Sequence, residues 1–217
     1  MSAIARTGRS RSPSSRANKI ETAVTVWTLP NLLSLFRIAI IPFLVYLLTF
    51  TDPVSAVWAA FLFMLASLTD FFDGYLARRN QSVSNFGKIL DPLADKLMIL
   101  SALVMLAAMD RMDEPEVPGW LVAVVVARET AVTILRGIAL TEGIVMEAEE
   151  LGKYKFILQS FAVFGLLLHY PYLGIDFYAI GMYFLVVSAV IAIWSGVNYH
   201  RRFFQLWRQK SVAAKSP

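Results

Sequence analysis

The sequence lacks cysteine altogether, and it contains only two histidines among 217 residues. The first absence excludes disulfide bonds and metal sites built on thiolates, so any cofactor must be held by oxygen or nitrogen. Charged residues are also scarce, at 17% of the chain, whereas 57% of the residues are hydrophobic. The mean hydropathy of +0.58 points to a membrane protein. His169 and His200 fall near the ends of apolar segments, and we assign neither a catalytic role.

Apolar runs recur along the chain, each long enough, at about 20 residues, to cross a hydrocarbon layer about 30 Å thick. They do not alternate with a period of two, and in lipid only helices or closed barrels satisfy the backbone, so the runs predict helices. The expected fold is all-α, a polytopic membrane protein with six transmembrane helices. The predicted spans are roughly 30–50, 54–77, 89–109, 117–140, 152–170 and 177–199.

Basic residues gather on one side of these predicted spans: before the first, between the second and third, at the start of the fifth and after the sixth. The positive-inside rule then puts both termini in the cytoplasm. The pI of about 9.4 reflects this topology and contact with anionic lipids, and we expect no binding to nucleic acid. We expect a basic, disordered tail with a short interfacial segment at 1–28, a six-helix domain at 29–204 and a cytoplasmic tail at 205–217.

Four aspartates stand at the facing ends of the second and third spans: Asp70, Asp73, Asp91 and Asp95. A carboxylate inside a membrane helix is disfavoured by roughly 2.5–3.5 kcal/mol, so we interpret the four as a functional site. Oxygen ligands without cysteine or a nearby histidine favour Mg²⁺ or Mn²⁺, and four carboxylates suffice for two ions. Such a metal pair suits a diphosphate. The alternative is that neighbouring basic residues neutralise the aspartates in a solvated helix turn.

The face that carries Asp70 and Asp73 continues with small residues. Gly74 and Ala77 leave room for a ligand beside the carboxylates, and the planar guanidinium of Arg78 suits a phosphate. These residues therefore predict a phosphate-binding strip at the cytoplasmic end of the second span.

The first span begins with polar residues at a spacing of three. Asn31, Ser34 and Arg37 share one helical face. Either they cap the helix and reach the membrane interface, or they line the same cytoplasmic cavity as the aspartates.

A second group of charges lies in the fourth and fifth spans. Arg128 and Arg136 are two turns apart inside an apolar segment, which indicates a polar cavity, and Glu129 would hold Arg128 in place. Lys153 and Lys155 begin the fifth span. Together the four cations predict a pocket for a second, anionic substrate. Anchoring of the span by the positive-inside rule also explains Lys153, but it does not explain the arginines.

The interval pattern Asp70-x2-Asp73-Gly74-x2-Ala77-Arg78-x8-Gly87-x3-Asp91-x3-Asp95 resembles the signature of the CDP-alcohol phosphatidyltransferases, with all eight fixed residues present. The resemblance covers about residues 29–204. It implies a dimeric, metal-dependent membrane enzyme that transfers a phosphatidyl group from a CDP-linked lipid to an alcohol and releases CMP.

Carried over by residue, the resemblance implies that the four aspartates hold a pair of divalent ions and that Asp95 also acts as the general base. The residues that would border the CDP-lipid are Gly74, Ala77, Arg78 and Gly87.

The acceptor is indicated by the segments TLPNLLSLFR, ARE-x6-R and GKYK, which are similar to the phosphatidylglycerophosphate synthase branch of that family. That branch uses sn-glycerol 3-phosphate. The residues that would bind this acceptor are Arg128, Arg136, Lys153 and Lys155, with Ser34 and Tyr199 as further candidates. Two positions depart from the branch: Phe156 replaces a threonine after Lys155, and Ser34 stands where threonine is common.

Three alternatives remain at this stage. Inositol phosphate, serine or phosphatidylglycerol could be the acceptor in the same family. A divalent-cation transporter would use the aspartates as a transit site, although carriers bind near the midplane and these carboxylates cluster at one face. An inactive, structural member of the family is the third. The leading hypothesis is a homodimeric transferase of the inner (plasma) membrane that uses CDP-diacylglycerol and glycerol 3-phosphate, with its site facing the cytoplasm.

Overall fold

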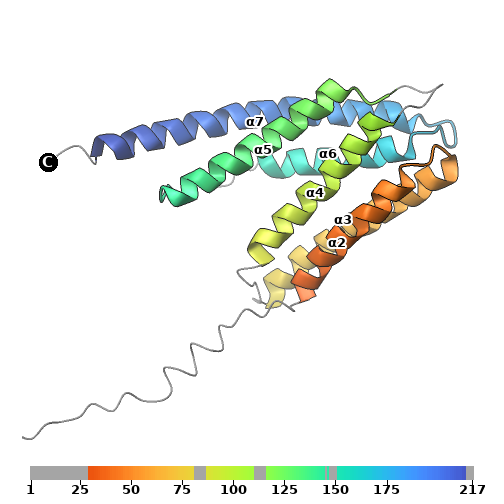
Figure 1. Ribbon diagram of the computed structural model, residues 1–217, viewed down its shortest axis with the longest axis horizontal. Coiled ribbons are helices and arrows are strands. Elements are labelled where there is room, and N and C mark those ends of the chain that lie inside the picture. Colours follow the sequence, from red (N-terminus) through yellow and green to blue (C-terminus); the bar gives the residue numbers. More distant parts are fainter. Residues whose placement is uncertain (1–28, 81–86, 110–115, 145, 147–150, 214–217) are drawn as a thin grey trace, which may run out of the picture.

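The computed structural model describes residues 29–80, 87–109, 116–144, 146 and 151–213, with side chains for all of these except 29–30, 70–80, 87–89, 151–153 and 211–213. This part of the chain is all-helical, as the sequence predicts (Figure 1). Each helix covers one of the six apolar segments. The helices are α2 (Leu29–Leu47), α3 (Pro53–Asn80), α4 (Gly87–Ala108), α5 (Gly119–Thr141), α6 (Leu151–Leu168) and α7 (Phe177–Ala213).

Within the described ranges, α7 from Phe177 to Lys210 is the one helix long and apolar enough to cross a membrane. Shorter apolar stretches occupy Asn31–Leu47, Pro53–Thr69 and Tyr154–Leu168. Large apolar side chains also cover the outside of the helices, and several are more than half exposed. A protein surrounded by water rarely exposes so much apolar surface, which a bilayer would cover. Examples are Phe43, Trp58, Trp120 and Trp194.

Helix α3 begins at a residue pair suited to a helix start. Asp52 Oδ1 accepts hydrogen bonds from the backbone N–H groups of Val54 and Ser55, both at 3.0 Å, and Pro53 occupies the first helical position. The hydrogen bond from the Ser55 side chain is the main cause that lowers the pKa of the Asp52 carboxyl. Asp52 therefore fixes where the chain turns from α2 into α3.

The helices form two groups that meet at one end. Helices α2, α3 and α4 pack together, α7 packs along both α5 and α6, and the groups join chiefly through α3 and α6. In Figure 1 the helices converge at the right and spread apart toward the left and bottom. The cytoplasmic ends predicted for α3, α4, α5 and α7 all lie at the spread end.

The most extensive helix contact joins α6 to α7, and two glycines make it close. A Cβ on Gly165 would lie 2.9 Å from Gly181 Cα, and one on Gly181 would lie 2.7 Å from the backbone nitrogen of Leu166. Only hydrogen fits at either position, so the two backbones are in direct contact.

Tyrosine hydroxyls tie the converged end together. In the loop between α6 and α7, Tyr170 donates to the carbonyl of Thr51 at 2.5 Å, and Tyr172 donates to the carbonyl of Pro53 at 3.4 Å. These bonds join the α6–α7 loop to the start of α3.

Candidate functional site

The polar face of α2 lies against the aspartates of α4. Arg37 is completely buried, and it donates from Nη2 to Asp91 Oδ1 at 2.6 Å and from Nη1 to Asp95 Oδ1. Ser34 Oγ also donates to Asp91 Oδ1, at 3.1 Å. Asn31, one helical turn before Ser34, is buried as well. These contacts place the polar face of α2 beside two of the four aspartates, which favours the second of the two interpretations of that face.

The two α4 carboxylates differ in their access to solvent. The Asp91 side chain is 46% exposed, whereas the Asp95 side chain is 17% exposed and the Arg37 side chain 0%. A soluble ligand therefore reaches Asp91 first, and Asp95 lies deeper, beside the buried guanidinium. One arginine facing two carboxylates leaves a net negative charge, which favours binding of a cation.

The remaining residues of the predicted donor site belong to the last turns of α3 and the start of α4. The backbone of α3 is helical from Asp70 through Asn80, and Gly87 is the first residue of α4. The side chains of Asp70, Asp73, Gly74, Ala77 and Arg78 lie outside the described ones.

The side chains of two of the four predicted metal ligands are described, those of Asp91 and Asp95. Among the side chains that the structure describes, no three acidic or histidine residues form a cluster. The described half of the predicted ligand set, Asp91 and Asp95, offers carboxylate oxygens close to one another, and these are the ligands that Mg²⁺ and Mn²⁺ prefer. The residues present therefore fit a hard divalent cation.

A second polar cluster lies between α5, α6 and α7, around a buried carboxylate. Glu129 is 5% exposed, and its Oε1 accepts from Arg128 Nη1 at 2.8 Å and from Lys155 Nζ. Arg128 further donates from Nε to the carbonyl of Ala192 at 2.8 Å and from Nη2 to Ser195 Oγ at 3.0 Å. The prediction that Glu129 holds Arg128 is confirmed, and Glu129 holds Lys155 as well.

Arg128 is therefore a structural link as well as a cation. Its three nitrogens each make one hydrogen bond to a protein group, and the two bonds to Ala192 and Ser195 join α5 to α7. Each Nη carries two N–H groups, so each could also donate once to a ligand.

Two further members of the cluster are Arg136 and Tyr199, both candidates from the sequence. The guanidinium carbon of Arg136 lies 5.9 Å from the centre of the Tyr199 ring, a cation–π distance. Tyr199 is 4% exposed, and among the described residues its hydroxyl has no hydrogen-bond partner. A buried hydroxyl without a partner costs about 1–3 kcal/mol, so it marks a place where a ligand oxygen could bind.

Lys96, next to Asp95, connects the two clusters. Its Nζ donates to Thr133 Oγ1 at 2.5 Å, and Thr133 Oγ1 donates to the carbonyl of Glu129 at 2.7 Å. The aspartates of α4 and the charges of α5 are therefore neighbours in space, although Glu129 follows Lys96 by 33 positions in the sequence.

Sequence reasoning missed Gln159 and gave Lys96 no role in substrate binding. Gln159 is 3% exposed, lies one turn after Lys155 on α6, and its Nε2 has no partner among the described residues. The available signal was a glutamine inside an apolar segment, four residues after a lysine. The side chain of Lys153 lies outside the described ones.

The family model described as CDP-alcohol phosphatidyltransferase matches residues 27–194. A relative from Bacillus subtilis (strain 168), named CDP-diacylglycerol–glycerol-3-phosphate 3-phosphatidyltransferase, is 39% identical over 184 residues, covering 78% of this chain and 93% of its own.

Two further relatives carry the same name. The one from Rickettsia typhi is 37% identical over 174 residues, which cover 80% of this chain and 95% of the relative. The one from Pectobacterium atrosepticum is 37% identical over 179 residues, with 80% and 93% covered.

Proposed function

The chain belongs to the CDP-alcohol phosphatidyltransferase family, and from this premise we propose that it transfers a phosphatidyl group from CDP-diacylglycerol to sn-glycerol 3-phosphate. The products are phosphatidylglycerophosphate and CMP. The choice of acceptor rests on one observation: relatives that are 37–39% identical over most of their length share a name that specifies glycerol 3-phosphate. The cationic cluster of α5 and α6 supports it, because this acceptor carries a phosphate.

The donor site consists of the last turns of α3 and the first turns of α4. Asp70, Asp73, Asp91 and Asp95 would hold two divalent ions, Mg²⁺ or Mn²⁺, which would neutralise the diphosphate and polarise its phosphorus atoms. Support comes from the neighbouring carboxylates of Asp91 and Asp95 and from the family's signature. The residues that would border the CDP-lipid are Gly74, Ala77, Arg78 and Gly87.

Asp95 is the general base of this proposal. The contact with Arg37 holds the Asp95 carboxylate in place beside the predicted metal ligand Asp91. Asp95 takes the proton of the acceptor hydroxyl as the oxygen attacks the phosphorus of the phosphatidyl group. One phosphorus–oxygen bond forms to glycerol 3-phosphate, and the bond to the CMP oxygen breaks.

The acceptor phosphate binds among the cations of α5 and α6: Arg128, Arg136, Lys153 and Lys155. Glu129 orients Arg128 and Lys155, since one oxygen accepts from both. Tyr199 contributes its unpaired hydroxyl, and Ser34 lies at the aspartate end of the site. The Lys96–Thr133 bond keeps the acceptor cluster next to the base, which brings the two substrates together.

The protein acts as a homodimer in the inner membrane, with six spans and with both termini and the active site on the cytoplasmic side. The apolar outer surface of the helices and the apolar length of α7 support the membrane location. Chromatography with light scattering in detergent tests the dimer, and the positions of cysteines introduced into the Cys-free chain test the topology.

The experiment that tests the reaction is an acceptor panel. Purified protein in mixed micelles receives CDP-diacylglycerol, Mg²⁺ or Mn²⁺, and one acceptor at a time. We expect release of CMP with glycerol 3-phosphate and little with inositol phosphate, serine or phosphatidylglycerol. Release with another acceptor alone would overturn the acceptor and keep the class of reaction; no release with any would overturn both.

A further inference from the structure

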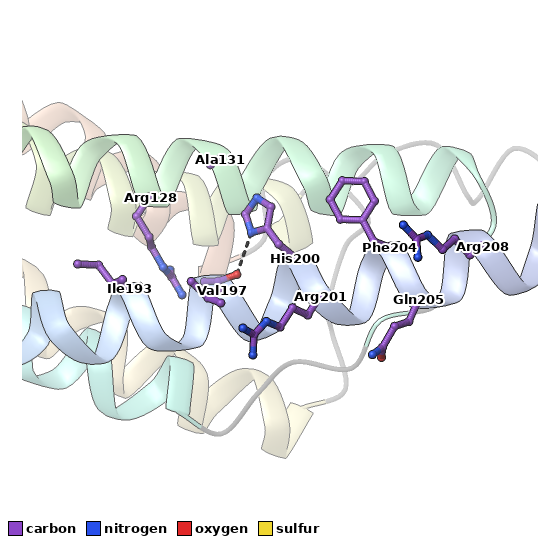
Figure 2. A pocket seen from close by; sticks show the side chains of 10 residues that line it. Arg128, Ala131, Ile193, Val197, His200, Arg201, Phe204, Gln205 and Arg208 are labelled. Carbon is purple, nitrogen blue, oxygen red and sulfur yellow. Dashed lines mark hydrogen bonds between the residues drawn. The ribbon is translucent and has the colours of Figure 1, made fainter.

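A cavity of about 690 Å³ lies between α5 and α7 and shares Arg128 with the Glu129 cluster. Figure 2 shows it from close by: Arg128 and Ala131 line it from α5, and the other labelled residues line it from α7. We call this cavity the α5–α7 groove.

The groove is basic toward the C-terminus of α7. Arg201 and Arg208, two turns apart on α7, are both exposed and both line it there. Arg128 lines it from α5 at the other end, beside Ile193 (Figure 2). Among the side chains that the structure describes, no acidic one lines the groove. His200 also lines it, and the hydrogen bond between its Nδ1 and the carbonyl of Gly196, at 2.8 Å, fixes the ring.

Toward the opposite end, the α7 side of the groove is apolar. Val197 lines it one turn before Arg201 and Ile193 two turns before, and both are nearly half exposed. An arginine side chain with its charge beyond an apolar stretch is the arrangement expected where a helix passes from lipid to the headgroup layer. A ligand that fills the groove needs an anionic part and an adjoining apolar part.

The groove lies on a different face of α7 from the acceptor cluster. Ser195 and Tyr199 are buried on the inner face, whereas Val197, Arg201 and Arg208 belong to the exposed one. Arg128 is common to both, because it lines the groove and bonds to Glu129. A ligand in the groove would therefore be separate from the reacting substrates, but it would touch a residue of the acceptor cluster.

We propose that the α5–α7 groove binds an anionic phospholipid, with its phosphate at Arg201 and Arg208 and its acyl chains along Ile193 and Val197. The charge of the lining selects an anionic headgroup over a zwitterionic one. The apolar end selects a lipid over a free phosphate. This site is distinct from the proposed reaction and does not depend on which acceptor the enzyme uses.

Native mass spectrometry of the full chain in detergent tests the proposal with two probes, dioleoylphosphatidylglycerol and dioleoylphosphatidylcholine. The test variant is Arg201→Gln/Arg208→Gln. The control, Arg202→Gln/Lys210→Gln, removes the same charge from the same part of α7 but from residues that do not line the groove. We expect the wild type and the control to retain more phosphatidylglycerol than phosphatidylcholine. The test variant should retain about tenfold less phosphatidylglycerol than the wild type.

A second variant, Ala131→Phe, fills the groove without changing the charge, and it should lose the lipid as well. Equal retention of the two lipids by the wild type, or equal losses in the test and control variants, would overturn the proposal. So would displacement of the lipid by millimolar inorganic phosphate or glycerol 3-phosphate, which would indicate a site for soluble phosphates. Loss of the dimer in the test variant alone would also overturn the proposal, because it would show that the groove is a contact between subunits.

Discussion

The guanidinium of Arg37 on α2 contacts both Asp91 and Asp95 of α4 while having no exposure to solvent. Arg37 therefore holds together two carboxylates that would otherwise repel each other, and it joins the first span to the proposed active site. Replacing Arg37 with Met should leave the Asp95 carboxylate partly buried without its cation. We expect a loss of about 3 kcal/mol in the free energy of unfolding and loss of CMP release.

The matched change for this prediction is Arg37→Lys, which keeps the charge but cannot form two parallel contacts. It should unfold between the wild type and Arg37→Met in a thermal denaturation series in detergent. If Arg37→Met unfolds like the wild type, the ion pairs contribute nothing to the fold.

Asp95→Asn removes the proposed base with almost no change of shape. Turnover should fall by at least about a hundredfold, since general base catalysis contributes 10²–10⁴-fold. Thermal unfolding should stay close to that of the wild type, and Mn²⁺ binding, measured by electron paramagnetic resonance, should be only partly reduced. Asp176→Asn makes the same chemical change at the start of α7, where Asp176 Oδ1 accepts from Ala179 N at 2.9 Å. Full activity in Asp95→Asn would remove Asp95 as the base.

Removal of divalent ions tests the metal part of the proposal. Treatment with EDTA should stop CMP release, and Mg²⁺ or Mn²⁺ should restore it. Ca²⁺ should restore it poorly, because it is larger and takes more ligands in a less rigid geometry. The measurement is the rate of CMP release against the concentration of free metal. Undiminished release after exhaustive chelation would contradict the assignment of the four aspartates as metal ligands.

Glu129→Gln tests whether a buried carboxylate positions the acceptor site. Loss of its charge weakens its hold on Arg128 and Lys155, so the KM for glycerol 3-phosphate should rise about tenfold, equivalent to about 1.4 kcal/mol. The KM for CDP-diacylglycerol should change little. Glu142→Gln, at an exposed carboxylate that ends α5, is the control. A parallel rise in both KM values would mean that Glu129 supports the fold in general and has no particular role at the acceptor.

Gly165→Ala tests the close contact of α6 and α7. The new methyl group would lie 2.9 Å from both Gly181 Cα and the carbonyl of Phe177, so the helices must move apart. We expect a loss of about 1–3 kcal/mol in stability, measured by thermal unfolding in detergent. Gly137→Ala on α5 meets nothing within 4 Å and should be neutral or slightly stabilising. Equal effects of the two changes would argue against a packing role for Gly165.

The sequence predicts the helices well because long apolar runs have one stable backbone conformation in lipid. It also indicates that Asn31, Ser34 and Arg37 share a face, since this follows from helical geometry alone. It could not assign the Arg37 contacts to Asp91 and Asp95, because these residues are more than 50 positions apart and meet only through the packing of α2 on α4.

The same limit applies to the acceptor cluster. The neighbouring residues Arg128 and Glu129 predict their own ion pair, whereas Lys155 reaches Glu129 from another helix. The role of Lys96 depends on α4 lying beside α5. The α5–α7 groove is likewise a product of packing, since the spacing of Arg201 and Arg208 in the sequence indicates only a basic end to the last span.

The hydroxyls of Tyr170 and Tyr172 restrain the helices at one end of the molecule. They fasten the α6–α7 loop to the start of α3, at the end where the helices converge. Helix α7 has 37 residues and is therefore about 55 Å long, so a rotation of about 5° at this end moves its far end by about 5 Å. The spacing of the helices at the spread end is therefore the dimension most sensitive to small rotations at the converged end.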